Sequence, residues 1–240
     1  MDKQRVFEIM GKLYGNDVYR AAIQFDDTEN DLRVIKDILD EINSFGYSVC
    51  SLSRLNDVED IRVVSVILKH YRRFDAIRYR CGVLSAIKFR SYAGFVPNLL
   101  EIYHSCNSRE IRNTISSCLL LIRDRTHVED YLRIVLEPGY GCVVDYRDMD
   151  YMMALLCELR VTDVLPKLLA LVKTSPLWNW TFLRYAAYFK DPSVIEHLAP
   201  FLESDDAEYR TMAKKAIHKL KLAQRNATCS AETHLKSAKG

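Results

Sequence analysis

Three closely spaced aspartates are the residues of this sequence whose type and spacing could do chemistry. Asp145, Asp148 and Asp150 alternate with tyrosines, and they follow a connector, residues 138–144, that contains two glycines and Tyr140. Such carboxylates could attract a basic partner electrostatically, or one of them could serve in catalysis. Because this region departs from the pattern of the rest of the chain, we treat it as a candidate site.

Asp150 stands at a position that is apolar elsewhere. Counted from the hydrophobic–Arg pairs described below, the same position holds Cys81, Ile115, Ala187 and Ala213. A buried carboxylate is costly unless it is paired. The alternative is a rotated helix in which Met149, Met153 and Leu156 face the core and Asp150 lies in water.

Both tryptophans of the protein, Trp178 and Trp180, lie in one break between two predicted helices, and Arg184 follows. Tryptophan, tyrosine and arginine dominate the energetically important centres of protein interfaces. The segment therefore predicts either a contact surface or packing against a neighbouring repeat.

Other chemical signals are weak. The run Lys69–Phe74 interleaves basic and aromatic residues, which could follow a phosphate backbone or simply form a solvated face. No phosphate-binding glycine loop, zinc-binding His-Glu-x-x-His or nucleophile-elbow motif occurs. The sequence predicts no catalytic residue, no metal and no cofactor.

The elements that must position these residues are predicted by a repeated pair, a hydrophobic residue followed by arginine. The arginines are spaced 34, 35, 37 and 26 residues apart, which indicates stacked helical hairpins. They are Arg78, Arg112, Arg147, Arg184 and Arg210. We expect Arg78, Arg112 and Arg210 to form a structural ladder with carboxylates such as Asp75, Asp145 or Asp205, because a cation in the first helical turn opposes the helix dipole.

Apolar residues at i, i+4, i+7 and i+11 outline the second helices of these hairpins. One stripe starts at Ile111 and ends at Ile122, a second runs from Tyr209 to Leu220, and a third starts at Ile77. A first helix is expected after Asp57 with Ile61 on its apolar face, and residues 2–45 predict two or three capping helices. The polar, aperiodic residues 224–240 predict a disordered tail.

Composition points to a reducing compartment and a protein partner. The seven cysteines are scattered without a Cys-x-x-Cys pair, which indicates reduced thiols. The chain holds no stretch of about 18 apolar residues, and its N-terminus lacks the apolar run of a signal peptide. Together these features predict a cytoplasmic location without membrane contact. Residues 1–60, 61–125, 126–163 and 164–240 carry net charges of −6, +8, −5 and +5. Blocks of alternating sign suit a protein partner better than nucleic acid.

The hairpins resemble HEAT and armadillo-type repeats. The resemblance lies in a proline within the first helix, a polar break and a hydrophobic–Arg pair early in the second helix, as in Leu165-Pro166 onward and in Leu198-Ala199-Pro200 through Tyr209-Arg210. It implies an all-α fold, a right-handed α-solenoid of about five to six hairpins. We expect one domain over residues 1–223, with an irregular cap at 1–55 and regular repeats at 56–223.

The leading interpretation is a non-enzymatic module that binds another protein with a basic surface, as an adaptor or inhibitor. A bacterial immunity protein that neutralises a toxin is one such inhibitor. The predicted partner-binding residues are Tyr140, Asp145, Asp148, Asp150, Trp178, Trp180 and Arg184. The alternative, which the resemblance to HEAT repeats also allows, is a HEAT-like DNA glycosylase that acts on alkylated bases. Asp150 would supply the carboxylate that such an enzyme uses.

Overall fold

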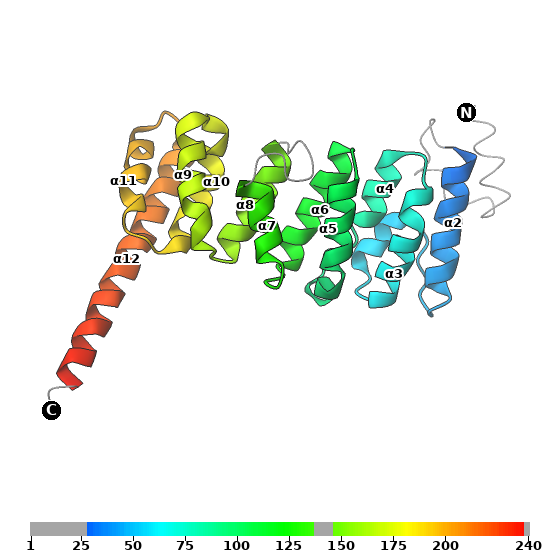
Figure 1. Ribbon diagram of the computed structural model, residues 1–240, viewed down its shortest axis with the longest axis horizontal. Helices are drawn as coiled ribbons and strands as arrows, with labels where there is room; N and C mark the ends of the chain where they lie inside the picture. Colours follow the sequence, from blue (N-terminus) through cyan, green and yellow to red (C-terminus); the bar gives the residue numbers. More distant parts are fainter. Residues whose placement is uncertain (1–27, 137–145, 238–240) are drawn as a thin grey trace. The chain divides into compact units, whose positions relative to one another are not determined.

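The computed structural model describes residues 28–136 and 146–237, with side chains from 28–136 and 149–226. The regular secondary structure of this described part is helical, and it contains no strand. The all-α prediction is therefore confirmed. Figure 1 shows the helices following one another as short, roughly parallel and antiparallel rods within each part of the chain.

The chain divides into two compact units, each with its own helices. Unit 1 comprises Met1–Asp124 and Gly141–Asp148, and unit 2 comprises Arg125–Tyr140 and Met149–Gly240. Because each repeat of a helical array contacts mainly its neighbours, such an array separates easily into units. The single domain expected over residues 1–223 therefore stays a prediction.

The described part of unit 1 starts with helix α2 (Glu29–Asn43). A capping box lies at its N-terminus: Thr28 Oγ1 accepts a hydrogen bond from the Asp31 amide, and the Asp31 carboxylate accepts one from the Thr28 amide. The same carboxylate, fully buried, accepts a hydrogen bond from the Asp75 amide at 2.7 Å. This single side chain thereby ties α2 to the segment that leads into α4. The other elements described between residues 44 and 124 of unit 1 are η1 (Leu52–Asp57), α3 (Ile61–His70), η2 (Tyr71–Arg73), α4 (Ile77–Leu84), η3 (Arg90–Phe95), α5 (Val96–Ser105) and α6 (Arg109–Ile122).

The hairpin of α5 and α6 matches its sequence pattern closely. Ser108 caps α6 by accepting a hydrogen bond from the Ile111 amide at 3.3 Å, and the predicted stripe from Ile111 to Ile122 is buried. The preceding helix α3 differs from its prediction. Asp60 rather than Asp57 caps it, and Ile61 is exposed, because the buried face runs through the valines that follow.

Unit 2 contains α7 (Val128–Leu136), most of α8 (Tyr146–Glu158) and the pairs that follow. Next come η4 (Thr162–Val164), α9 (Leu165–Thr174), η5 (Pro176–Trp178), α10 (Asn179–Tyr185), η6 (Ala186–Phe189), α11 (Val194–Leu198), η7 (Ala199–Glu203) and α12 (Ala207–Ser237). Pro166 lies in the first turn of α9, as predicted, where a missing amide hydrogen costs no helical bond. The predicted stripe of α12 is buried at Ala213, Ala216 and Leu220.

Within each unit the second helices of successive hairpins pack on one another. Helix α4 contacts α6 in unit 1, and α10 contacts α12 in unit 2, while each first helix contacts its own partner, as α5 contacts α6. Stacking of equivalent helices is what a repeat array requires, because a single hairpin cannot bury its apolar face.

Two of the repeated arginines, Arg112 and Arg210, donate to backbone carbonyls, and so does Arg80, whereas the ladder of carboxylates stays a prediction. Arg80, Arg112 and Arg210 are each the fourth residue of their helix, and each donates to the carbonyl six residues earlier. The distances are 2.7 Å from Arg80 Nε to Phe74, 3.1 Å from Arg112 Nη1 to Cys106 and 2.5 Å from Arg210 Nη1 to Ser204.

These arginines close the loop between the two helices of a hairpin. Carbonyls just after a helix lack helical partners, and a guanidinium supplies donors for them. In α4 this role belongs to Arg80, two residues after the predicted Arg78, and in α10 the fourth residue is the buried Phe182. Arg184, which the sequence pattern placed in the same series, therefore stands outside it.

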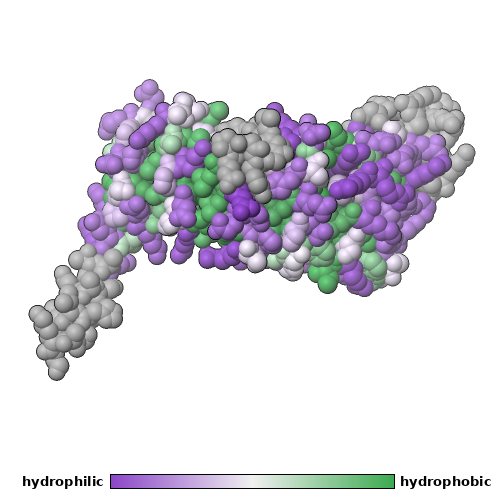
Figure 2. Space-filling view, in the orientation of Figure 1, coloured by the Kyte–Doolittle hydropathy of each residue, from purple (hydrophilic) through white to green (hydrophobic). Residues whose placement is uncertain are grey.

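Helix α12 continues to Ser237, beyond the start of the predicted disordered tail at residue 224. Residues 224–237 contain no proline or glycine and several strong helix formers, which allows a helix without an apolar face. Among the described helices none has the length and hydropathy to cross a bilayer. Hydrophilic side chains cover much of the face drawn in Figure 2, with apolar patches between them.

Candidate protein-binding surface

The carboxylate of Asp150 is half-buried in unit 2 and hydrogen-bonded. Its Oδ1 accepts a hydrogen bond from Oγ1 of Thr181, a fully buried residue of α10. Burial raises the pKa of the Asp150 carboxyl above its usual range, and the hydrogen bond from Thr181 and the charge of Arg184 oppose the rise. Met153 and Leu156 are buried as the rotated-helix interpretation requires, but its placement of Asp150 in water is wrong.

The other acidic candidates do not join Asp150 in the described part. Tyr140 and Asp145 lie outside the described residues, and Asp148 lies on α8 with its side chain outside them. What the structure brings together from the predicted set is Asp150, Trp180 and Arg184, through helices α8 and α10 of unit 2.

The two tryptophans have opposite environments. Trp178 ends η5 and is buried, so it packs in the core as one of the two interpretations held. Trp180 is the second residue of α10 and is 38% exposed. Only Trp180 can therefore belong to a contact surface.

Trp180 is part of an exposed row of four side chains, here called the Trp180 stripe. Leu177 and Tyr188 are 60% and 40% exposed, Arg184 is exposed, and with Trp180 they are spaced i, i+3, i+7 and i+11. This spacing follows one face of a helical segment. The opposite face is packed in the core through Trp178, Phe182, Tyr185 and Phe189.

Arg184 is stacked on its aromatic neighbours. Its guanidinium carbon lies 4.7 Å from the Trp180 ring centroid and 5.4 Å from that of Tyr185, within the range of cation–π attraction. Tyr185 also meets Tyr188 edge to face at 5.7 Å. These contacts hold the long side chain of Arg184 in place although it is exposed.

Basic side chains of the run Lys69–Phe74 form ion pairs with acidic residues within unit 1. Lys69 forms an ion pair with Glu41 at 2.9 Å, and Arg73 forms one with Asp37 at 2.6 Å. His70, buried between them, lies 2.9 Å from Glu41 and 2.6 Å from Arg73. Part of the alternating charge along the sequence is thus balanced between α2 and the α3–η2 segment, and these cations are not arrayed for a phosphate backbone.

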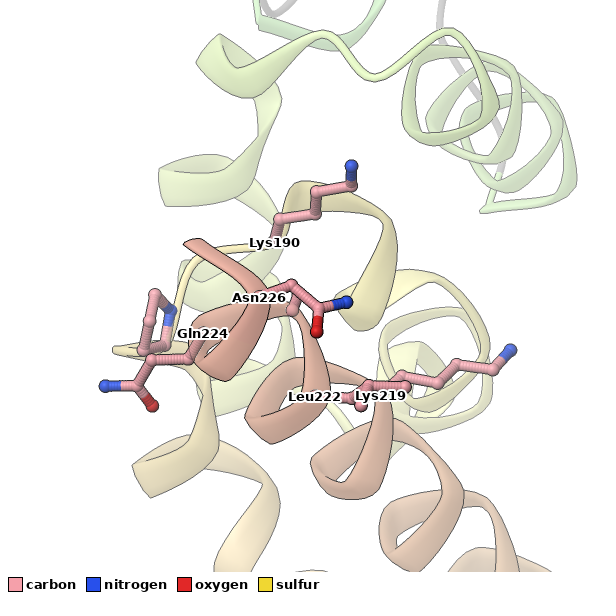
Figure 3. A pocket seen from close by; sticks show the side chains of 7 residues that line it. Lys190, Lys219, Leu222, Gln224 and Asn226 are labelled. Atoms are coloured by element: carbon pink, nitrogen blue, oxygen red, sulfur yellow. The ribbon is translucent and has the colours of Figure 1, made fainter. Parts of the chain in front are cut away.

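Two other kinds of site give no stronger candidate in the described residues. No group of three or more potential metal ligands gathers there. A surface pocket of about 670 Å³ is lined by Lys190 and Pro192 on one side and by α12 residues from Lys219 to Asn226 on the other. Figure 3 shows the two lysine ammonium groups pointing in different directions, so they do not converge on one ligand.

Sequence reasoning missed Leu177, Thr181 and Tyr188 as site residues. A periodicity reading of 177–189 as one continuous helical segment would have separated its two faces, with Leu177 and Tyr188 on the same face as Trp180. Thr181 carried no signal, because its partner Asp150 is distant in the sequence.

Comparison with models of known protein families gives no match for this chain, and neither does comparison with curated protein sequences.

Proposed function

We propose that this protein is a non-enzymatic module of HEAT-like helical repeats that binds another protein through the Trp180 stripe, as an adaptor or inhibitor. The observation that carries the proposal is the exposed row of Leu177, Trp180, Arg184 and Tyr188 on a segment whose opposite face is packed. Tryptophan, tyrosine and arginine are the residue types enriched where interfaces gain most of their affinity.

The stripe is also suited to binding because little of it must be ordered by the partner. The segment beneath it is fixed by buried aromatic residues, and Arg184 is already stacked on Trp180. Immobilising a flexible side chain costs about 0.5–1.5 kcal/mol on binding, so a side chain held in advance retains more of its contact energy.

A cytoplasmic location belongs to the same proposal. The scattered cysteines of the sequence suggest reduced thiols, and two of them, Cys118 and Cys157, are buried thiols whose pKa burial raises. Buried thiols of this kind are unreactive and serve as small apolar residues.

Affinity capture from the native host with matched variants tests the proposal. The test variant is Trp180→Ser combined with Tyr188→Ser, and the control is Ile61→Ser combined with Ile77→Ser, which removes exposed apolar side chains of unit 1. We expect a protein that is retained by the parent and the control and lost from the test variant. Equal capture by all three proteins would refute binding through the stripe.

The glycosylase alternative is tested on the same preparations. Release of alkylated bases from duplex DNA by the parent, lost in Asp150→Asn, would replace the proposed function with an enzymatic one. The binding proposal expects no base release from any of these proteins.

A further inference from the structure

We infer that the Trp180 stripe recognises an acidic segment of its partner, in which carboxylates flank an aliphatic or aromatic side chain. This inference rests on the proposed function, and it names the class of partner that the stripe would take. It reverses the sign of charge that the aspartate cluster predicted for the partner.

The charge around the stripe supports an acidic partner. Residues 164–190, which form α9, η5, α10 and η6, contain four basic residues and no acidic one. Lys173, Arg184 and Lys190 of this set are exposed. Charges of one sign across a surface attract and orient a partner segment of the other sign.

The nearby acids offset this charge only in part: Asp150 interacts electrostatically with Arg184, and Glu158 lies close enough to act on Tyr185, but the basic residues outnumber them. Asp150 faces α10 from α8 but is half-buried, and its carboxylate accepts a hydrogen bond from Thr181. Asp163 and Asp191 lie just outside the two ends of the basic segment, and the Asp191 carboxylate accepts a hydrogen bond from the Ser193 amide at 2.9 Å.

The geometry of Arg184 suits a carboxylate. The guanidinium carbon of Arg184 lies over the Trp180 ring, 4.7 Å from its centroid, and the N–H donors of a guanidinium lie in its plane at the edge. A planar guanidinium can donate two parallel hydrogen bonds to one carboxylate. The apolar surfaces of Leu177, Trp180 and Tyr188 lie along the same row and would contact an apolar side chain next to that carboxylate.

A displayed library of random peptides tests the inference with the full-length protein. Peptides are selected on the parent, synthesised, and measured by fluorescence anisotropy against the parent, Trp180→Ser, Arg184→Glu and Arg90→Glu. Arg90→Glu makes the same change in net charge at an exposed cation of unit 1. Circular dichroism verifies that each variant is folded.

We expect selected peptides that combine Asp or Glu with Leu, Phe, Tyr or Trp and that lose binding in Trp180→Ser. Arg184→Glu should weaken them by roughly fivefold or more, since an exposed ion pair contributes up to about fivefold and repulsion adds to its loss. Arg90→Glu should leave their affinity unchanged.

The outcomes separate the inference from the function on which it rests. Peptides that depend on Trp180 but are basic or uncharged, or that bind Arg184→Glu as well as the parent, overturn the acidic partner and leave the binding surface standing. Failure to select any peptide whose binding depends on Trp180 overturns both.

Discussion

Replacing Thr181 with valine isolates the hydrogen bond that holds α8 against α10. Valine has nearly the shape of threonine, but it removes the hydroxyl that donates to the Asp150 carboxylate, and Thr181 is fully buried. A hydrogen bond to a charged group contributes about 1.5–3 kcal/mol. For a chain of this size, the loss corresponds to a decrease of roughly 3–12 °C in melting temperature.

The assay is denaturant unfolding followed by tryptophan fluorescence. Both tryptophans of the chain lie within three residues of Thr181, so the signal reports on this part of unit 2. As the pH rises through the raised pKa of its carboxyl, Asp150 ionises, and the valine variant then lacks a charge-assisted bond. At a pH well below its ordinary pKa of 3.8 the carboxyl is protonated, and a bond to a neutral group contributes only about 0.5–1.5 kcal/mol.

We therefore expect Thr181→Val to destabilise unit 2 more at neutral pH than at low pH. The control is Thr181→Ser, which keeps the hydroxyl and removes one methyl group, a loss of about 1 kcal/mol that should not vary with pH. If the valine variant is as stable as the parent at neutral pH, or if its loss is the same at every pH, the hydrogen bond does not hold these helices together.

Three further predictions concern the site, the repeats and the tail. Asp150→Asn keeps an acceptor for Thr181 and removes the charge. Because burial raises the pKa of Asp150, the folded state favours the protonated carboxyl. In urea titrations across pH, the stability of the parent should therefore fall relative to that of the variant as the pH rises above about 3.8. Arg112→Met leaves the Cys106 carbonyl without its guanidinium donor, and we expect a loss of about 1.5–3 kcal/mol in denaturation followed by circular dichroism, with Arg112→Lys recovering part of it. Deleting residues 227–240 should reduce the helical signal in circular dichroism and leave the free energy of unfolding within about 0.5 kcal/mol of the parent's, because Leu220 is the last buried residue in the described part of α12. A larger loss of stability in a urea titration would show that the deleted segment packs on the protein.

The repeated arginines show which structural features sequence periodicity can predict and which it cannot. Spacing alone indicated hairpins and a structural role for Arg112 and Arg210, and both roles agree with the structure. Sequence reasoning paired each cation with an acid, which stays a prediction, and gave no weight to the unsatisfied carbonyls of the loop, to which Arg112 and Arg210 donate. In α4 the arginine that donates to a loop carbonyl is Arg80, which stands outside the predicted series, and only packing identifies it.

The Trp180 stripe shows the opposite limit. Composition identified Trp178, Trp180 and Arg184 as unusual, yet residues two positions apart on a helix face different directions, and the sequence did not say which tryptophan is buried. The pairing of Asp150 with Thr181 was equally invisible, because it depends on how α8 lies on α10.

The sequence by itself determined the local elements: the helical class, the proline in the first turn of α9, the cap at Ser108 and the buried stripes of α6 and α12. These follow from interactions within a few residues, which propensity and periodicity record. The tertiary structure decided which side chains are buried between helices, which carbonyls the arginines reach, and which face of α10 is left exposed. Those outcomes depend on contacts between segments distant in the chain, whose geometry no local pattern specifies.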